Sequence, residues 1–228
     1  MSNTTSNTWT MAIDTGNTFI LPSICFFGIV TNLINIKVFL NKRIKDIAFK
    51  YYLLNGFSNL FYLSICFFVF CFRCGTYYQA SQLSATLVTK VYTWIFYTYI
   101  KGIFAFFTIF IQITLGFFRL CIVTNRGIDI FKRYKVICFI FFIISALIYT
   151  PNLYTQTILT SQVTKNNTTR LVYTMTTSSI GKTDFGKWSV IVVTILRGHI
   201  SLCAMIIIDV YTFIKLKRQI INSSKLRG

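Results

Sequence analysis

The sequence predicts an all-α polytopic membrane helix bundle with five transmembrane helices. Three observations predict it: 54% of the 228 residues are hydrophobic, only 12% are charged, and long apolar stretches alternate with short basic segments. An ordinary soluble domain carries about 25% charged residues, so this chain lacks the polar side chains that a water-facing shell needs. We therefore expect lipid to surround most of it.

Five apolar stretches are each near or above the roughly 20 residues that a helix needs to cross a bilayer. They cover residues 19–40, 51–72, 91–118, 136–154 and 188–214. A polar N-terminal tail, 1–18, precedes this transmembrane region of 19–214, and a basic tail, 215–228, follows it. No basic segment precedes the first stretch and no small-residue cleavage pattern follows it, so we interpret it as a retained anchor rather than a signal peptide.

The charges predict how these helices are oriented. Lys and Arg total 23 against 5 Asp and Glu, a net charge of +18. Nucleic acid is not the expected partner, because the cations punctuate apolar stretches instead of gathering on one polar segment. Basic residues concentrate in 41–50, 119–135 and 215–228, and such loops stay in the cytosol. We expect an integral membrane protein, at the plasma membrane, with the N-terminus outside and the C-terminus cytosolic.

Glycosylation signals agree with that orientation. Asn-x-Ser/Thr occurs at Asn3, Asn166 and Asn167, all on segments that the charge pattern places outside the cell. An acceptor for N-glycosylation has to lie on that side of the membrane.

Amide side chains inside the first two spans predict a structural polar network. Asn55 and Asn59 lie four residues apart and share one face of the second helix, where they could hydrogen-bond to Asn32 of the first. Polar groups within a bilayer are expensive and usually face partners inside the bundle. The alternative to a functional role is simple interhelical adhesion, at about 0.6 to 2 kcal/mol for each hydrogen bond.

Three segments carry a resemblance to a known family. They are GIVTNLINIKVF at 28–39, LLNGFSNL at 53–60 and LGFFRLCI at 115–122. Their order and spacing resemble the first three helices of rhodopsin-like G-protein-coupled receptors, and their character is most similar to divergent invertebrate peptide and chemosensory receptors. The likeness extends along the whole chain, whose end after the fifth span suggests a receptor truncated before helices six and seven.

The resemblance implies a role for Arg119, which matches the arginine of the family's Asp/Glu-Arg-Tyr motif. That arginine closes the cytosolic face at rest and meets the heterotrimeric G protein when the receptor is active. Phe118 replaces the acidic neighbour, so we expect a weaker resting contact, which an Asp at position 118 would restore. The family's outer disulfide is not expected, because Trp94 lies about where its first Cys belongs and 155–187 contains no Cys.

Two cations near the outer ends of the third and fifth spans are candidate ligand-binding residues. Lys101 and Arg197 lie at similar distances from the basic inner ends of their helices. We expect them to line a wet cavity that prefers an anionic ligand, since charges at that level need water or a counter-ion. The alternative, equally open, is that both extend to the outer lipid headgroups.

Catalysis is not expected. The chain has one His, no Glu and five scattered Asp, which leaves no metal cluster and no paired carboxylates for acid–base chemistry; we expect no cofactor. The expected function is therefore that of a G-protein-coupled receptor, or a fragment of one, sensing an extracellular peptide or small ligand. The alternative is a non-signalling multi-pass membrane protein, such as a truncated receptor partner or a channel or transporter subunit.

Overall fold

Five long helices make up most of the part of the protein that the structure describes. The computed structural model describes residues 19–40, 46–73, 86–125, 127–165 and 168–225. The helices are long and apolar enough to cross a membrane, with lengths of 19 to 38 residues. They are α2 (Leu21–Phe39), α3 (Ile47–Arg73), α5–η3–α6 (Leu87–Tyr92, Thr93–Ile100 and Lys101–Thr124), α7 (Tyr134–Tyr154) and α9–η5–α10 (Asp184–Ile195, Leu196–Ile200 and Ser201–Lys225).

The prediction of five apolar helices long enough to span a membrane is thereby confirmed, and most of them extend beyond the predicted bounds. The third helix begins at Leu87 because the Thr86 side chain accepts a hydrogen bond from the Thr89 amide and caps it. The fifth helix does not stop at 214, and α10 continues through most of the predicted basic tail to Lys225. Lys, Arg and Gln in that segment are good helix formers, so the helix extends past the apolar residues.

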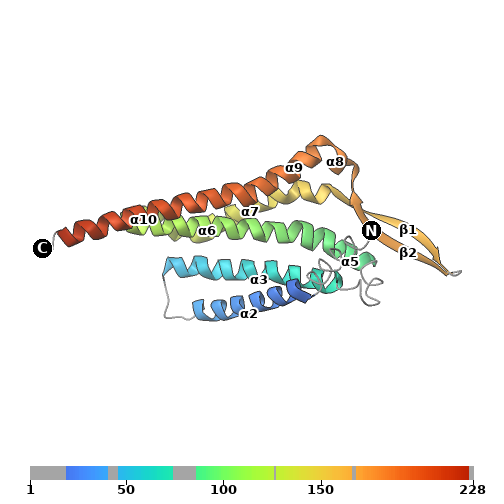
Figure 1. Cartoon of the computed structure of the whole chain (residues 1–228), viewed down its shortest axis with the longest axis horizontal. Helices are drawn as coiled ribbons and strands as arrows, with labels where there is room; N and C mark the ends of the chain where they lie inside the picture. Colours follow the sequence, from blue (N-terminus) through green and yellow to red (C-terminus); the bar gives the residue numbers. More distant parts are fainter. Residues whose placement is uncertain (1–18, 41–45, 74–85, 126, 166–167, 226–228) are drawn as a thin grey trace, which may run out of the picture.

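The helices run alternately in opposite directions around α6. Figure 1 shows α2 and α3 on one side of α6 and the α9–α10 helix on the other, and α7 packs against α6 as well. Of the five helices, the one containing α6 has the most buried apolar stretch. The others present large apolar side chains outward, among them Phe139, Ile207 and Phe213, each about two-thirds exposed. Such a surface indicates a membrane-embedded protein.

The expectation of an all-α chain is wrong for the segment after α7. Residues Gln156–Lys165 (β1) and Thr168–Thr177 (β2) pair as an antiparallel hairpin, with Gln156 opposite Thr177. Thr, Val, Ile and Tyr dominate both strands, and these side chains favour extended backbone. A short helix, α8 (Ser179–Lys182), follows the hairpin and leads into α9.

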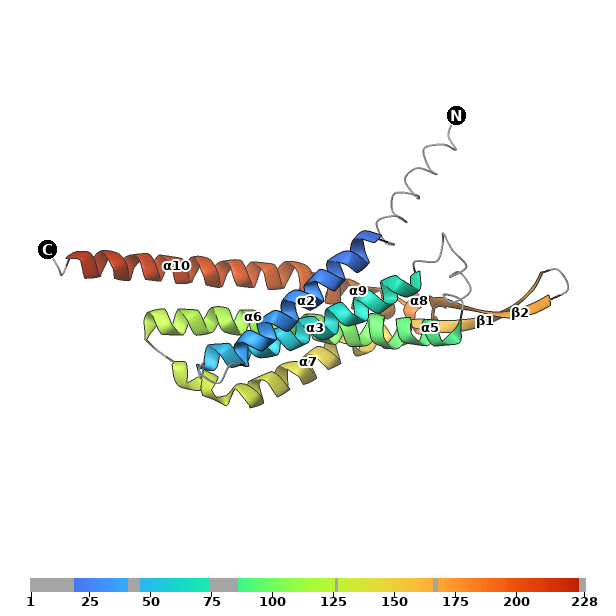
Figure 2. The ribbon, with the colours of Figure 1, turned by 90° about the horizontal axis from the view of Figure 1, so that it is seen from below.

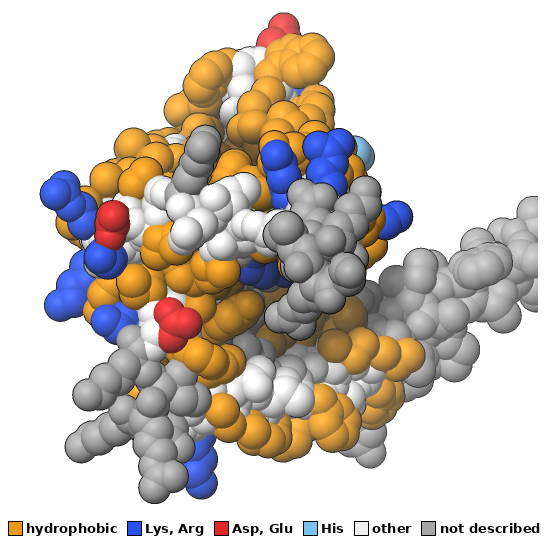
Figure 3. Space-filling model, turned by 90° about the vertical axis from the view of Figure 1, so that its left-hand side faces the viewer, with side chains coloured by type: hydrophobic (Ala, Val, Ile, Leu, Met, Phe, Trp, Pro, Cys, Tyr) orange, Lys and Arg blue, Asp and Glu red, His pale blue; other side chains and the backbone are white. Residues whose placement is uncertain are grey.

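The two ends of the bundle differ in charge. We call the end that carries β1 and β2 the hairpin end and the opposite one the basic end. A short helix, η4 (Ile128–Arg133), joins α6 to α7 at the basic end. Exposed cations there include Lys50, Lys132, Arg133, Lys217 and Arg218. Figure 3 looks onto this end and shows Lys and Arg side chains spread around it.

Two apolar clusters along α6 hold the bundle together. The one nearer the basic end contains Tyr51, Ile111 and Phe118. The one nearer the hairpin end contains Phe106, Tyr149 and neighbours from α9. Because lipid is as apolar as these side chains, close packing and interhelical hydrogen bonds stabilise such an arrangement more than removal from water does.

Candidate functional site

An ion pair joins α6 to α10 near the basic end. Arg119 Nη2 lies 3.7 Å from Asp209 Oδ1, and each side chain is 55% exposed. Arg119 Nε also donates to the Leu115 carbonyl oxygen, one turn earlier, at 3.4 Å. The helices are close at this level because Gly116 has no side chain: a Cβ there would lie 3.0 Å from Ile208 Cγ2.

A second polar contact joins the same two helices closer to the basic end. Gln219 Nε2 of α10 donates to the carbonyl oxygen of Val123, in the last turn of α6. Beyond this contact α10 runs past the end of α6 (Figure 2). The ion pair therefore lies between a close helix crossing and a side-chain contact, both of which fix α10 against α6.

Arg119 has a carboxylate partner even though Phe118 replaces the neighbouring acid, and the strength of the resting contact stays a prediction. Its carboxylate partner comes from another helix, at Asp209, and not from position 118. Phe118 is 4% exposed and packs edge-on against Phe131 of η4, with ring centroids 5.2 Å apart. An Asp at position 118 would therefore place a carboxylate in the apolar cluster instead of restoring a contact.

The predicted amide network takes a different form. Asn32 Nδ2 donates at 2.7 Å to the Gly28 carbonyl oxygen of its own helix and not to α3. Asn59 Oδ1 accepts from Thr108 Oγ1 of α6 at 3.4 Å. Asn55 Oδ1 is buried and has no hydrogen-bond partner within the described residues. Asn59 thus bonds to α6, and Asn32 bonds within α2, so the hydrogen bond predicted between the amides of α2 and α3 does not form at Asn32.

Hydroxyl groups that the sequence reasoning passed over provide the main polar contact between α3 and α6. Thr108 Oγ1 donates to Ser58 Oγ at 2.8 Å, and Ser58 Oγ donates to the Phe104 carbonyl oxygen at 3.0 Å. Both hydroxyl side chains are buried. The sequence carried a signal for this contact, because Ser58 lies between the two amides Asn55 and Asn59 on the same stretch of helix.

Near the hairpin end, two of the long helices contain π-helical turns, η3 and η5. In each, a hydroxyl bonds the carbonyl five residues earlier: Thr98 Oγ1 donates to Thr93 O at 3.1 Å, and Ser201 Oγ donates to Leu196 O at 2.7 Å. Such turns are rare and occur frequently at functional sites. The two turns interrupt the helices that also form the ion pair, and each lies beside one of the predicted cations.

Lys101 directly follows η3 and Arg197 lies within η5. Arg197 Nη2 donates to the Tyr62 hydroxyl of α3 at 3.5 Å and lies close to the Tyr149 hydroxyl of α7. Lys101 Nζ lies 3.4 Å from the centre of the Tyr97 ring, a cation–π contact. Arg197 therefore points into the bundle, which argues against the headgroup alternative for this residue.

The structure brings the two cations to one region beside α3. The buried thiol of Cys66, one turn from Tyr62, lies within electrostatic reach of both Lys101 and Arg197. Gly102, next to Lys101, makes room for this arrangement, since a Cβ there would overlap the Tyr149 ring, 2.0 Å from Cε1. Tyr149 can reach Arg197 because α6 has no side chain at that position.

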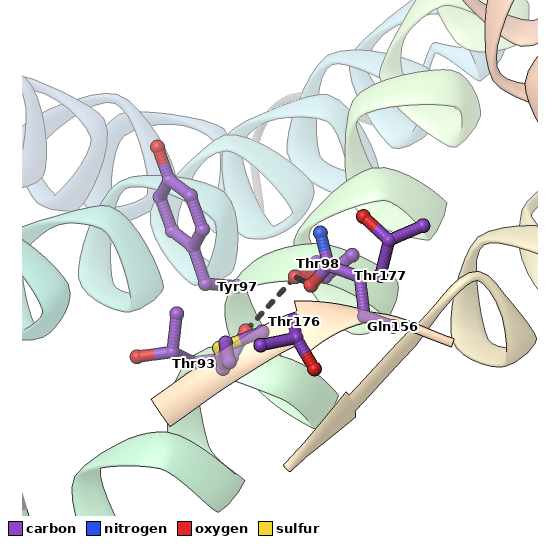
Figure 4. A pocket seen from close by; sticks show the side chains of 7 residues that line it. Thr93, Tyr97, Thr98, Gln156, Thr176 and Thr177 are labelled. Atoms are coloured by element: carbon purple, nitrogen blue, oxygen red, sulfur yellow. Dashed lines mark hydrogen bonds between the residues drawn. The ribbon is translucent and has the colours of Figure 1, made fainter. Parts of the chain in front are cut away.

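A cavity of about 330 Å³ opens between η3 and the hairpin. Its lining is hydroxyl-rich and includes Thr93, Thr98, Gln156, Thr176 and Thr177. Figure 4 shows these side chains close together, while the Tyr97 side chain points away from Gln156 and Thr176. Thr98 Oγ1 donates to Gln156 Oε1 at 3.4 Å, so one wall of the cavity joins the helix to β1. The sequence did not predict this cavity, because it did not predict the hairpin.

Trp94 connects two helices at the hairpin end of the bundle. Its indole Nε1 donates to the Leu153 carbonyl oxygen at 3.0 Å and so ties η3 to the last turn of α7. This contact lies about where the resemblance would place a disulfide.

Other predicted features remain without a structural description. Asn3, Asn166 and Asn167 fall outside the described residues. Among the residues that are described, no group of three His, Cys, Asp or Glu side chains is arranged to hold a metal ion. No protein-family model and no curated protein matches the sequence. Interpretation of the site therefore depends on the geometry of the two ends of the bundle.

Proposed function

We propose that the chain is a membrane receptor, or part of one, that senses an extracellular peptide or small ligand and signals to a heterotrimeric G protein. One observation carries the proposal: α6 and the α9–η5–α10 helix each have a cation near the hairpin end and one member of the ion pair near the basic end. At 1.5 Å per residue, Lys101 and Arg119 are about 27 Å apart along their helix. Arg197 and Asp209 are about 18 Å apart.

The proposed orientation has the hairpin end outside and the basic end in the cytosol of a cell, at the plasma membrane. The exposed Lys and Arg of the basic end support it, because loops rich in these residues are retained on the cytosolic side. The cavity beneath the hairpin then faces the extracellular space, and Arg119 faces the G protein.

Signalling in this proposal depends on how α6 and α10 sit against each other. A ligand that binds differently to two arrangements of these helices shifts the population between them. The Arg119–Asp209 contact is half-exposed, and ion pairs of that kind stabilise by about 1 kcal/mol or less. Because this contribution is small, a ligand that binds only modestly better to the second arrangement can separate Arg119 from Asp209. Arg119 then becomes available to the G protein.

Recruitment of G proteins to the chain in living cells tests the proposal. The chain is expressed with a luminescent tag and examined against a panel of Gα subunits, beside R119A and the control D129N. Asp129 pairs with Lys132 at the same end, so its neutralisation removes a negative charge there and leaves the Arg119–Asp209 pair in place. We expect one Gα class to be recruited by the wild type and D129N and lost in R119A at equal surface expression. Failure of every Gα class to associate with wild type would contradict the proposal.

A further inference from the structure

We infer that the hairpin-end half of the bundle holds an anion site, in which Arg197, Lys101 and the Tyr62 hydroxyl bind a monovalent anion such as a carboxylate. The inference deepens the proposed function and rests on it for the origin of a carboxylate ligand. Anion binding itself is measured without any G protein. The experiment can therefore disprove the anion site without disproving the proposed signalling function, and the reverse also holds.

The first step is the environment of the Arg197 charge. Its side chain is half-buried, and its contacts are with neutral phenol groups, Tyr62 at 3.5 Å and the nearby Tyr149. A phenol oxygen accepts a hydrogen bond from guanidinium but does not neutralise it. A cation within a membrane bundle is expensive unless an opposite charge or water accompanies it, so the position favours an anion.

The second step is that the protein's own carboxylates are placed elsewhere. Within the described part of the chain they are Asp209 with Arg119, Asp129 with Lys132, Asp184 with Lys187, and Asp46 just before α3 at the basic end. Asp184 is the one nearest the hairpin end, and it is 90% exposed. Among the described residues, therefore, the ion pairs of the carboxylates do not include Arg197.

The third step is the set of donors that converge there. Guanidinium offers several N–H groups in a plane, which suits the two oxygens of a carboxylate. Lys101 lies on the neighbouring helix within electrostatic reach of the same Cys66 thiol, and supplies a second positive charge. Tyr62 has a hydroxyl that donates to an anion once it turns from Arg197.

The fourth step is the backbone. Both cations lie on or directly after a π-helical turn, η5 or η3. A π turn inserts an extra residue into the helix and so changes the direction in which the following side chains point. Two such turns in two helices, each beside one cation, would aim both charges at one region next to α3.

Thermal unfolding of the purified full chain in lipid nanodiscs tests the site, with Trp fluorescence as the readout. Two titrations at constant ionic strength replace a bulky sulfonate buffer anion, one with acetate and one with chloride. At a concentration roughly 100-fold above Kd, we expect Tm to rise by about 5 °C. Stabilisation by acetate indicates a ligand carboxylate, whereas stabilisation by chloride alone indicates a free halide; each supports an anion site.

Variants separate this site from general salt effects. R197Q and K101Q should abolish the saturable shift, while K187Q, which removes a positive charge paired with Asp184 at the same end, should retain it. Y62F keeps both cations and should weaken the apparent affinity severalfold, so it serves if R197Q does not fold. A wild-type Tm that neither anion raises, or a shift that is equal in wild type, Y62F and K101Q, would overturn the inference.

Discussion

Arg119 of α6 and Asp209 of α10 form an ion pair of 3.7 Å between two membrane helices. They are far apart in sequence, and the pair lies beside the Gly116–Ile208 crossing. The motif around Arg119 suggested that its acidic partner had been lost with the substitution at position 118. Instead, the partner comes from a different helix, which makes the contact sensitive to how α6 and α10 move relative to each other.

The buried position of Phe118 leads to a stability prediction. F118A removes a ring that packs against Phe131 and leaves a cavity, so we expect unfolding to become easier by about 3 kcal/mol. F117A is the matched control, because Phe117 is 47% exposed and faces away from the cluster. Thermal unfolding in detergent measures both; equal losses would show that Phe118 does not anchor η4.

The close approach of α6 and α7 at Gly102 gives a second prediction. In G102A the new Cβ would overlap the Tyr149 ring, and relieving that overlap should cost about 1–3 kcal/mol. The same change in G198A meets nothing within 4 Å and should have little effect on Tm. If the two variants unfold alike, the ring does not occupy the position described.

The hydroxyl contact between α3 and α6 gives a third prediction. T108V removes the bond to Ser58 while keeping the shape of the side chain, and should destabilise by about 1 kcal/mol. T114V is the control: Thr114 is also buried, but its hydroxyl donates to the Phe110 carbonyl of its own helix. Comparing both by urea or thermal unfolding shows whether the contact between helices contributes more than the one within a helix.

The number of apolar helices could be predicted from the sequence because lipid imposes length and hydrophobicity directly on each span. Lys101 and Arg197 could be flagged for the same reason, since charges are rare in such segments, whereas Arg119 was singled out by the resemblance. The hairpin was not predicted, although the Thr, Val and Tyr residues between Gln156 and Thr177 are typical of strands.

Partners across helices were harder to predict than the residues themselves. Which face of a helix meets its neighbour depends on rotation and crossing, and the π turns change both within η3 and η5. Asn32 bonds its own helix at Gly28 instead of α3, and Asp209 meets Arg119 although nothing in their sequence separation indicates it. Short-range motifs carry no information about such pairs.

The central claim is that the Arg119–Asp209 pair restrains signalling to a G protein. The most direct test measures the basal rate of nucleotide exchange on a purified G protein of the recruited class, with the chain in nanodiscs. D209N removes the charge that holds Arg119, and loss of about 0.5–1 kcal/mol should raise the rate about two- to fivefold over wild type. D129N, which neutralises an Asp at the same end, should leave it unchanged. A rate in D209N that equals those of wild type and D129N would contradict the account.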